Sequence, residues 1–330
     1  MNFRGLQRTV IKTALVALAA LALKPALADT SYPHKPVKII LPFAAGGSSD
    51  VLTRLVADGL RKIWQQPVIV ENRSGASGMI AADLVAKAEA DGYTALMTVT
   101  ALVQAPAIYG KANFDPIKDF APISQVATMP LAFVVSAGSP VKTMADFVAL
   151  ARAKPGEVSY GSFGTGSAGH LYMELLQDAA KIQLIHAPYK GEQPTITDLI
   201  GGQIAGAIIS VPGAKTFVDS QKIRALAVTG PTRAQQLPDA PAFPEVGFRG
   251  VGLESIGWFG MLLPAKTPRD IVEKFSRDLN VVLAQPELRE RMQTYGISIT
   301  GTSPEAFASI IKSDNARWGK VIRDKNIKAN

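Results

Sequence analysis

The sequence predicts an α/β protein of two lobes, each with a central sheet flanked by helices. Segments with the apolar pattern of a buried strand alternate with segments of helical periodicity along most of the chain. The length of 330 residues exceeds one average domain. Extended, proline-marked segments interrupt the alternation near residues 123–135 and 231–263, where we expect the chain to cross between lobes.

The first lobe is predicted from residues 29–127 together with 256–330, and the second from residues 128–255. The alternation indicates a parallel sheet covered by helices. In the first lobe we expect strands at residues 37–43, 68–70, 94–99 and 257–263, and helices at 51–63, 80–88, 268–284, 286–295 and 304–324. In the second lobe we expect strands at 158–162, 182–186, 204–209 and 223–228, and helices at 143–153, 167–180 and 194–200.

Residues 1–28 have the pattern of a secretory signal peptide. Basic residues precede an apolar run at 13–23, and Ala26-Leu27-Ala28 is a small-residue cleavage site. No later stretch approaches the roughly 18 apolar residues of a spanning helix, so we expect a soluble, exported chain cleaved near Ala28. The sequence contains no cysteine, which excludes a lipid attachment site and a disulfide framework.

Composition excludes several functions. Without residues 1–28 the chain has 31 basic and 27 acidic residues, a net charge of +4 instead of +8, and no long Lys/Arg block that would bind nucleic acid. Three histidines without cysteine give no recognisable zinc spacing, and calcium-loop and dinucleotide patterns are absent. We therefore expect no metal and no cofactor.

Two glycine-rich loops carry the candidate binding chemistry, because each follows a predicted strand and precedes a helix. The N-H groups of a helix N-terminus favour an anion, and glycine lets the backbone approach it closely. Ligands of open α/β sheets lie beyond the carboxyl ends of the strands, so the two loops would enclose one small anion. The candidates are Phe43, Ala45, Gly46, Gly47 and Ser48 in the first loop, and Ser162, Phe163, Gly164, Thr165, Gly166 and Ser167 in the second.

A plainer interpretation of both loops stays open, namely ordinary turns in which Ser48, Asp50 or Ser167 caps the following helix. We interpret Asp50 as a cap or scaffold residue. In the second loop, Gly164 and Gly166 are expected to offer backbone N-H groups to the ligand.

A serine hydrolase using Ser167 is the alternative from another functional class. A nucleophile elbow requires Gly-x-Ser-x-Gly, and Thr165 stands where the first glycine should be. His170 lies one turn into the helix that Ser167 opens, and we expect it to pack or hydrogen-bond within its lobe instead of acting as a base.

The chain resembles the Bug-type receptors of tripartite tricarboxylate transporters, also called TctC-type periplasmic solute-binding proteins. The resemblance covers nearly all of the chain after residue 28 and depends on short segments in a specific order. They include Pro42-Phe43-x-x-Gly46-Gly47-x-x-Asp50, Asp91-Gly92-Tyr93-Thr94, Lys118-Asp119-Phe120-Ala121-Pro122-Ile123, Tyr160-Gly161-Ser162-x-Gly164-x-Gly166 and Pro188-Tyr189-Lys190-Gly191.

The resemblance implies a periplasmic-binding-protein fold of the Venus flytrap kind, type II, without enzymatic activity. It implies a monomeric receptor in the periplasm that closes around a carboxylate and delivers it to the membrane subunits of such a transporter; a receptor for a signalling partner is the alternative. Carried over by position, both loops and a middle wall near Thr98 and Thr100 would contact the ligand.

One departure from the family bears on the ligand. Many relatives carry an acid in a Phe-Asp pair where this chain has Ala207-Ile208-Ile209-Ser210, and we include Ser210 among the candidate ligand residues. Without that acid a ligand amine would lose its counter-charge, which favours di- or tricarboxylates and aromatic acids over amino acids. Phe43 and Phe163 would flank an aromatic ring or, equally well, pack in the core.

Overall fold

The computed structural model describes residues 32–43, 45–189 and 191–328. Residues 35–330 form one compact unit. The predicted signal peptide, residues 1–28, lies outside the described residues. Within the described ranges, no helix combines the length and the apolar character that crossing a membrane requires.

The first lobe is built on a six-stranded sheet with the strand order β11-β4-β10-β3-β1-β2. Its strands are β1 (Val37–Leu41), β2 (Val68–Asn72), β3 (Thr94–Val99), β4 (Phe120–Met129), β10 (Gly257–Pro264) and β11 (Ser298–Ile299). The helices of this lobe are α2 (Ser48–Trp64), η1 (Ala76–Gly78), α3 (Met79–Ala86), α4 (Ala101–Tyr109), α9 (Arg269–Leu283), α10 (Pro286–Thr294) and α11 (Pro304–Asp324).

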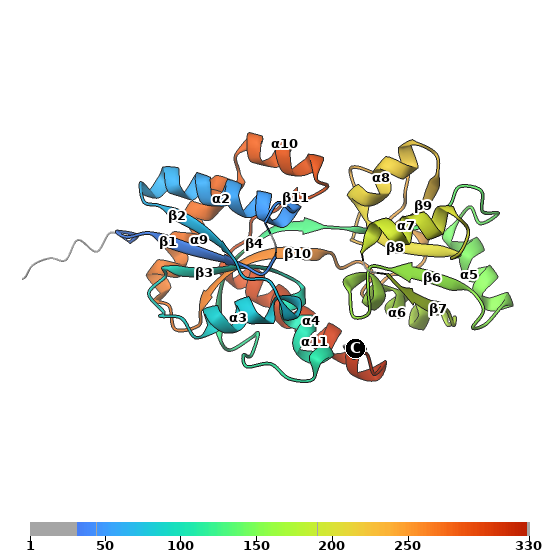
Figure 1. The fold of residues 1–330 in the computed structure, drawn as a ribbon, viewed down its shortest axis with the longest axis horizontal. Helices are drawn as coiled ribbons and strands as arrows, with labels where there is room; N and C mark the ends of the chain where they lie inside the picture. Colours follow the sequence, from blue (N-terminus) through green and yellow to red (C-terminus); the bar gives the residue numbers. More distant parts are fainter. Residues whose placement is uncertain (1–31, 44, 190, 329–330) are drawn as a thin grey trace, which may run out of the picture. The chain divides into compact units, whose positions relative to one another are not determined.

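The second lobe is built on a five-stranded sheet with the order β7-β6-β8-β5-β9. Its strands are β5 (Leu131–Ser136), β6 (Ser159–Ser162), β7 (Ile185–Pro188), β8 (Gly206–Ser210) and β9 (Ile223–Val228), as Figure 1 shows. The helices are α5 (Met144–Ala153), α6 (Ala168–Ala180), α7 (Glu192–Ile200), α8 (Val211–Asp219) and η2 (Phe243–Val246). Two sheets flanked by helices confirm the predicted two-lobed α/β fold.

The prediction of parallel sheets is only partly right. β1 pairs in parallel with β2 and β3, and β6 with β7 and β8. However, β10 runs antiparallel to β3 and β4, and β5 runs antiparallel to β8 and β9. The reason is the chain path, because β4 and β5 are separated by Pro130 alone and β10 brings the chain back from the second sheet to the first.

Local signals in the sequence explain several helix starts. Buried Leu52, Val56 and Leu60 repeat along one face of α2, which is the pattern of an amphipathic helix. Thr143 and Asp146 form the predicted capping box at the start of α5.

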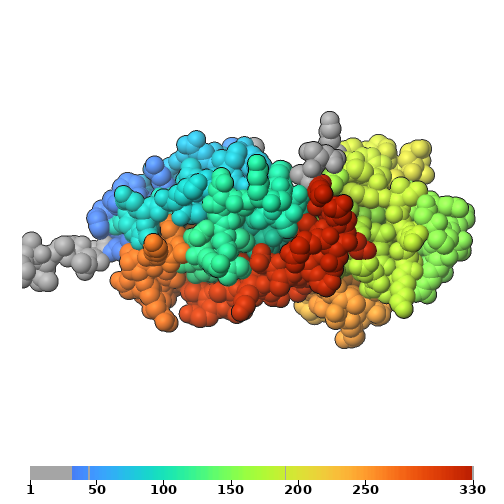
Figure 2. Space-filling view, turned by 90° about the horizontal axis from the view of Figure 1, so that it is seen from below, coloured from blue at the N-terminus to red at the C-terminus, as the bar shows by residue number. Residues whose placement is uncertain are grey.

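The C-terminal helix α11 packs against α4 and β4 and also contacts α6. Figure 2 shows its red surface beside the green surface of the α4 region.

Candidate ligand-binding site

The carboxylate of Asp50 fixes the backbone of the first loop through hydrogen bonds. Asp50 is 4% exposed, and its Oδ2 accepts hydrogen bonds from the N-H of Gly46 (3.0 Å) and from Nε of Arg54 (2.9 Å). Asn72 donates from Nδ2 both to Asp50 Oδ1 (3.0 Å) and to the carbonyl oxygen of Phe43 (2.9 Å). The Arg54 bond, assisted by the other two donors, lowers the pKa of Asp50 to about 2. The predicted scaffold role of Asp50 is confirmed.

The start of α2 is left without a side-chain cap. Its N-cap residue is Gly47, in an extended conformation, so neither Ser48 nor Asp50 caps the helix. Ala45, Gly46 and Gly47 are exposed, whereas Ser48 is half-buried. No described side chain therefore accepts a hydrogen bond from the first-turn N-H groups of α2, which leaves the positive end of the helix dipole available to an anion.

In the second loop, two of the expected donors are already in use. The N-H of Gly164 donates to Ser162 Oγ (3.2 Å), and the N-H of Gly166 donates to His170 Nδ1 (3.1 Å). The expectation that both groups face the ligand is therefore wrong in this conformation. The hydroxyl of Ser167 accepts from the N-H of His170 (3.3 Å) and caps α6.

A stacked pair of histidines supports the second loop from the interior of its lobe. The rings of His170 and His186 lie 4.0 Å apart, and Nε2 of His186 lies 2.7 Å from the hydroxyl of Ser162, which is fully buried. Burial, together with the neighbouring His170, lowers the pKa of His186 to about 4. His186 is therefore neutral at pH 7, and the expectation that His170 packs within its lobe is confirmed.

The geometry does not build a hydrolase at Ser167. Its hydroxyl is an acceptor for the helix N-H of His170, and the ring nitrogen Nδ1 of His170 is occupied by Gly166. The other ring nitrogen, Nε2, lies 3.6 Å from Glu174. Ser167 thus has neither a free base beside it nor the strained elbow that exposes a nucleophile.

A third helix, which the sequence did not predict, begins beside the two loops. Thr100 is the N-cap position of α4; its hydroxyl accepts from the N-H of Trp258 (2.9 Å), and its own N-H donates to the Trp258 carbonyl (3.2 Å). These bonds join the start of α4 to β10. Thr98, in β3, is 3% exposed.

These three helix starts line one cavity of about 490 Å³, which is a typical volume for a small-molecule site. From the first lobe it is lined by Phe43, Ser48, Ser49, Ser77, Val99, Thr100, Ala101, Gln104, Ala105, Ile108 and Tyr109. From the second lobe and the crossing strands it is lined by residues 163–168, Met129, Leu131, Tyr172, Gly257, Trp258 and Phe259. The structure thus brings the two glycine-rich loops together at one site.

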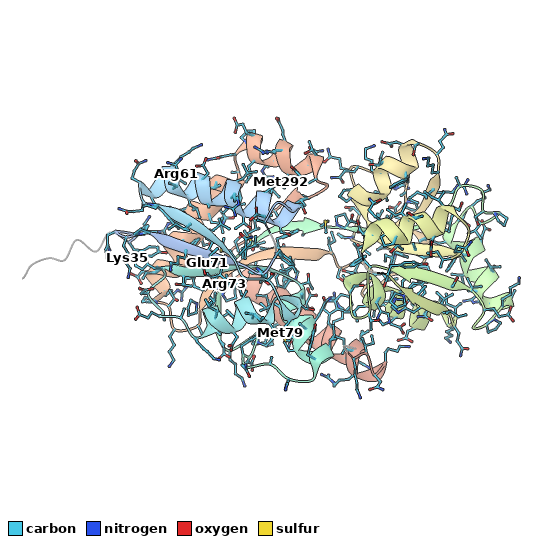
Figure 3. All side chains as sticks on the ribbon, in the orientation of Figure 1. Lys35, Arg61, Glu71, Arg73, Met79 and Met292 are labelled. Carbon is cyan, nitrogen blue, oxygen red and sulfur yellow. The ribbon has the colours of Figure 1, made fainter. Side chains whose placement is uncertain are left out.

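Among the described residues that line this cavity, none is charged. Arg73, just after β2, is paired with Glu71, and both are labelled in Figure 3; neither belongs to the cavity wall. Within the described part of the wall, positive potential comes from backbone N-H groups and helix dipoles. The wall is otherwise apolar and aromatic, apart from hydroxyl groups and the amide of Gln104.

Eight of the fourteen candidate residues line this cavity, and six do not. Phe43, Ser48, Thr100, Phe163, Gly164, Thr165, Gly166 and Ser167 line it, whereas Ala45, Gly46, Gly47, Thr98, Ser162 and Ser210 do not. Ser162 and Thr98 are buried behind the wall, and residues 45–47 are exposed beside Ser48.

Ser210 leads to a residue that the sequence interpretation missed. Its N-H and its hydroxyl donate to the two carboxylate oxygens of Glu192, at 2.6 and 2.9 Å. Glu192 and Ser210 line an adjoining groove that shares Ser48 and Phe163 with the main cavity. β8 itself carries no acid at this point, but α7 brings the carboxylate of Glu192 to Ser210. The absence of an acid from the strand therefore does not leave this spot without a carboxylate, and the preference for plain or aromatic acids over amino acids stays a prediction.

Two lobes that contribute helix starts to one cavity, with no charged side chain among its described lining residues, form the arrangement of a solute-binding protein. The model of the tripartite tricarboxylate transporter family receptor (TctC) matches residues 52–327, and the chain belongs to this family. The resemblance found in the sequence is therefore confirmed.

Three relatives illustrate the similarity. BugT of Bordetella pertussis is 32% identical over 315 residues, covering 95% of each chain. A Rhodopseudomonas palustris protein solved with adipate has 33% identity and a TM-score of 0.74, covering 90% of this chain and 99% of its own. MatC of R. palustris, solved with bound malate, has 27% identity and a TM-score of 0.71, covering 88% of this chain and all of its own, 100%.

Proposed function

We propose that this chain is a periplasmic receptor that captures a small organic carboxylate between its two lobes and delivers it to a tripartite tricarboxylate-type membrane transporter. The observation that supports this most directly is the cavity at which α2, α4 and α6 begin, whose described lining residues carry no charge. A carboxylate there would be held by helix N-H groups and hydroxyls without a cationic side chain. Adipate and malate in the two solved relatives are consistent with this chemistry.

The ligand site proper consists of residues from both loops and from the start of α4. Ser48 and the first turn of α2 would hold one side of the carboxylate, and Thr165 with the first turn of α6 the other. A ligand that touches both lobes stabilises their closed arrangement, which the membrane subunits would recognise. Shifting the lobes from mostly open to mostly closed requires about 5.5 kcal/mol of differential affinity.

Thermal unfolding with a panel of acids tests the binding function. The panel contains adipate, malate, benzoate and an acidic amino acid, with the corresponding methyl esters as uncharged controls. We expect at least one acid to stabilise the protein by about 2.7 kcal/mol at a hundredfold excess over its dissociation constant. Stabilisation by the esters as strongly as by the acids, or by no acid at all, would contradict the proposal.

Export and closure have separate tests. N-terminal sequencing of the protein recovered from the periplasm should begin at Asp29 if the cleavage follows Ala28.

Small-angle scattering tests closure: the protein with the stabilising acid should have a smaller radius of gyration than the protein without it. An unchanged scattering profile at saturation would rule out closure around the ligand, while leaving binding itself intact.

A further inference from the structure

Gln104 stands out in the cavity wall. It lies on the face of α4 that Ala101, Ala105 and Ile108 also form, at the helical spacing of three, four and seven residues, and all four line the cavity. Gln104 is only 4% exposed. Among the described residues, its side-chain nitrogen Nε2 is buried and has no hydrogen-bond partner.

A buried amide nitrogen without a partner lowers stability, and native proteins satisfy almost all such groups with protein or water. An alanine or leucine at this position would fit the apolar surroundings of α4 at no such cost, because the helix is otherwise almost entirely apolar. The unpaired N-H group of Gln104 is therefore best explained by a hydrogen-bond acceptor on the ligand. The terminal torsion of a glutamine is broad, so the amide can turn either end toward the cavity.

We propose that Gln104 forms a second polar subsite, which takes an uncharged oxygen of the ligand such as a hydroxyl or carbonyl group. The proposal rests on the proposed function, since the carboxylate of the same ligand is held at the helix starts. An amide offers one donor group and one acceptor and carries no charge, so it matches a neutral oxygen. A second carboxylate at this end would be desolvated without a counter-ion, because none of the described lining residues is cationic.

The ligand class that follows is a hydroxy or oxo acid with an apolar body. The carboxylate occupies the loop end of the cavity, Val99, Ile108 and Phe259 are among the residues that surround the body, and Gln104 binds the distal oxygen. Sites that hydrogen-bond a ligand hydroxyl reject the analogue without it, since the protein group is then left unpaired. We expect at least a tenfold preference for the oxygenated acid.

Isothermal titration with matched pairs of acids tests this subsite. The pairs are hexanoate with 6-hydroxyhexanoate and benzoate with 4-hydroxybenzoate, measured on the wild-type chain and on Gln104→Met, which keeps the length of the side chain and removes the amide. Wild type should bind the oxygenated member of at least one pair about tenfold more tightly. In Gln104→Met that ratio should fall to about one, with the plain acid bound within about threefold of wild type.

The unfolding temperature of the ligand-free variant distinguishes a binding role of Gln104 from a purely structural role. Because Nε2 has no hydrogen-bond partner among the described residues, ligand-free Gln104→Met should unfold at the same or a higher temperature than wild type. Gln104→Leu, which also removes the amide and adds no charge, repeats both measurements. An unchanged ratio in either variant, or a clearly lower unfolding temperature in both, overturns the subsite. Failure of every acid to bind wild type would instead refute the proposed function, and the subsite with it.

Discussion

Replacing Gly47 by aspartate places a carboxylate at the start of α2, beside Ser48 in the cavity wall. The backbone at Gly47 has φ −77° and ψ 169°, which any residue adopts, and a Cβ atom there meets nothing within 4 Å. Aspartate is also a favoured N-cap residue, so the fold should be unaffected or slightly stabilised. The same change at Gly164 would combine the added charge with backbone strain, because φ is +133° there and any side chain strains the loop.

The expected loss of affinity for Gly47→Asp follows from Coulomb's law. Two unit charges about 4 Å apart repel by about 4 kcal/mol at an effective dielectric constant of about 20, which corresponds to roughly a thousandfold in affinity. Gly47→Asn has the same shape and also caps the helix without the charge, so its loss should be smaller, about tenfold. Gly47→Ala should bind as wild type does.

The assay is isothermal titration with the acid that gives the largest thermal stabilisation, together with urea unfolding of each variant. The difference between the aspartate and asparagine variants isolates the charge, and it should shrink as the salt concentration rises. If Gly47→Asp bound the acid within about threefold of Gly47→Asn, the carboxylate would not lie at the start of α2, and the reasoning would be refuted.

Three further predictions concern the supports of the two loops. Asp50→Asn should destabilise the fold by about 1–3 kcal/mol in urea unfolding at pH 7; since the pKa of Asp50 falls from 3.8 to about 2 on folding, its contribution should be present above pH 3.8 and vanish toward pH 2. The pKa of His186 is 6.5 in the unfolded chain and about 4 in the folded protein, so the free energy of unfolding should decrease as the pH falls from 6.5 to 4. Ser162→Ala removes the hydrogen-bond partner of His186 and should lower the free energy of unfolding at pH 7. Gly166→Ala should cost about 1–2 kcal/mol and weaken acid binding in titration, because φ is +72° and the new Cβ lies 2.9 Å from Ile108 Cδ1; wild-type affinity would contradict this.

The sequence did not predict α4 or α8, and the reasons are physical. α4 is apolar on most sides and contains Pro106, so it shows neither the periodic contrast of an amphipathic helix nor an uninterrupted helical run. α8 has Pro212 and Gly213 in its first turn, a composition that is typical of a loop. Both helices are stabilised by packing against the rest of the fold, and the helix propensity of a segment does not include such tertiary contacts.

The candidate loops were found because strand, glycine-rich turn and helix follow one another in the sequence. What the sequence did not reveal is which N-H groups remain available. The N-H of Gly164 is used by a side chain two residues away and that of Gly166 by one four residues away, and both arrangements depend on His170 and His186 stacking inside the lobe.

The sequence by itself determined the alternation of strands and helices, the two-lobed class, the two loops and the family, because these depend on local pattern and order along the chain. Only the tertiary structure decided that both loops and the start of α4 line one cavity, that Gln104 lies in its wall, and that Glu192 reaches Ser210. These features arise where segments distant in the sequence meet, and burial and hydrogen-bond partners are settled only at such contacts.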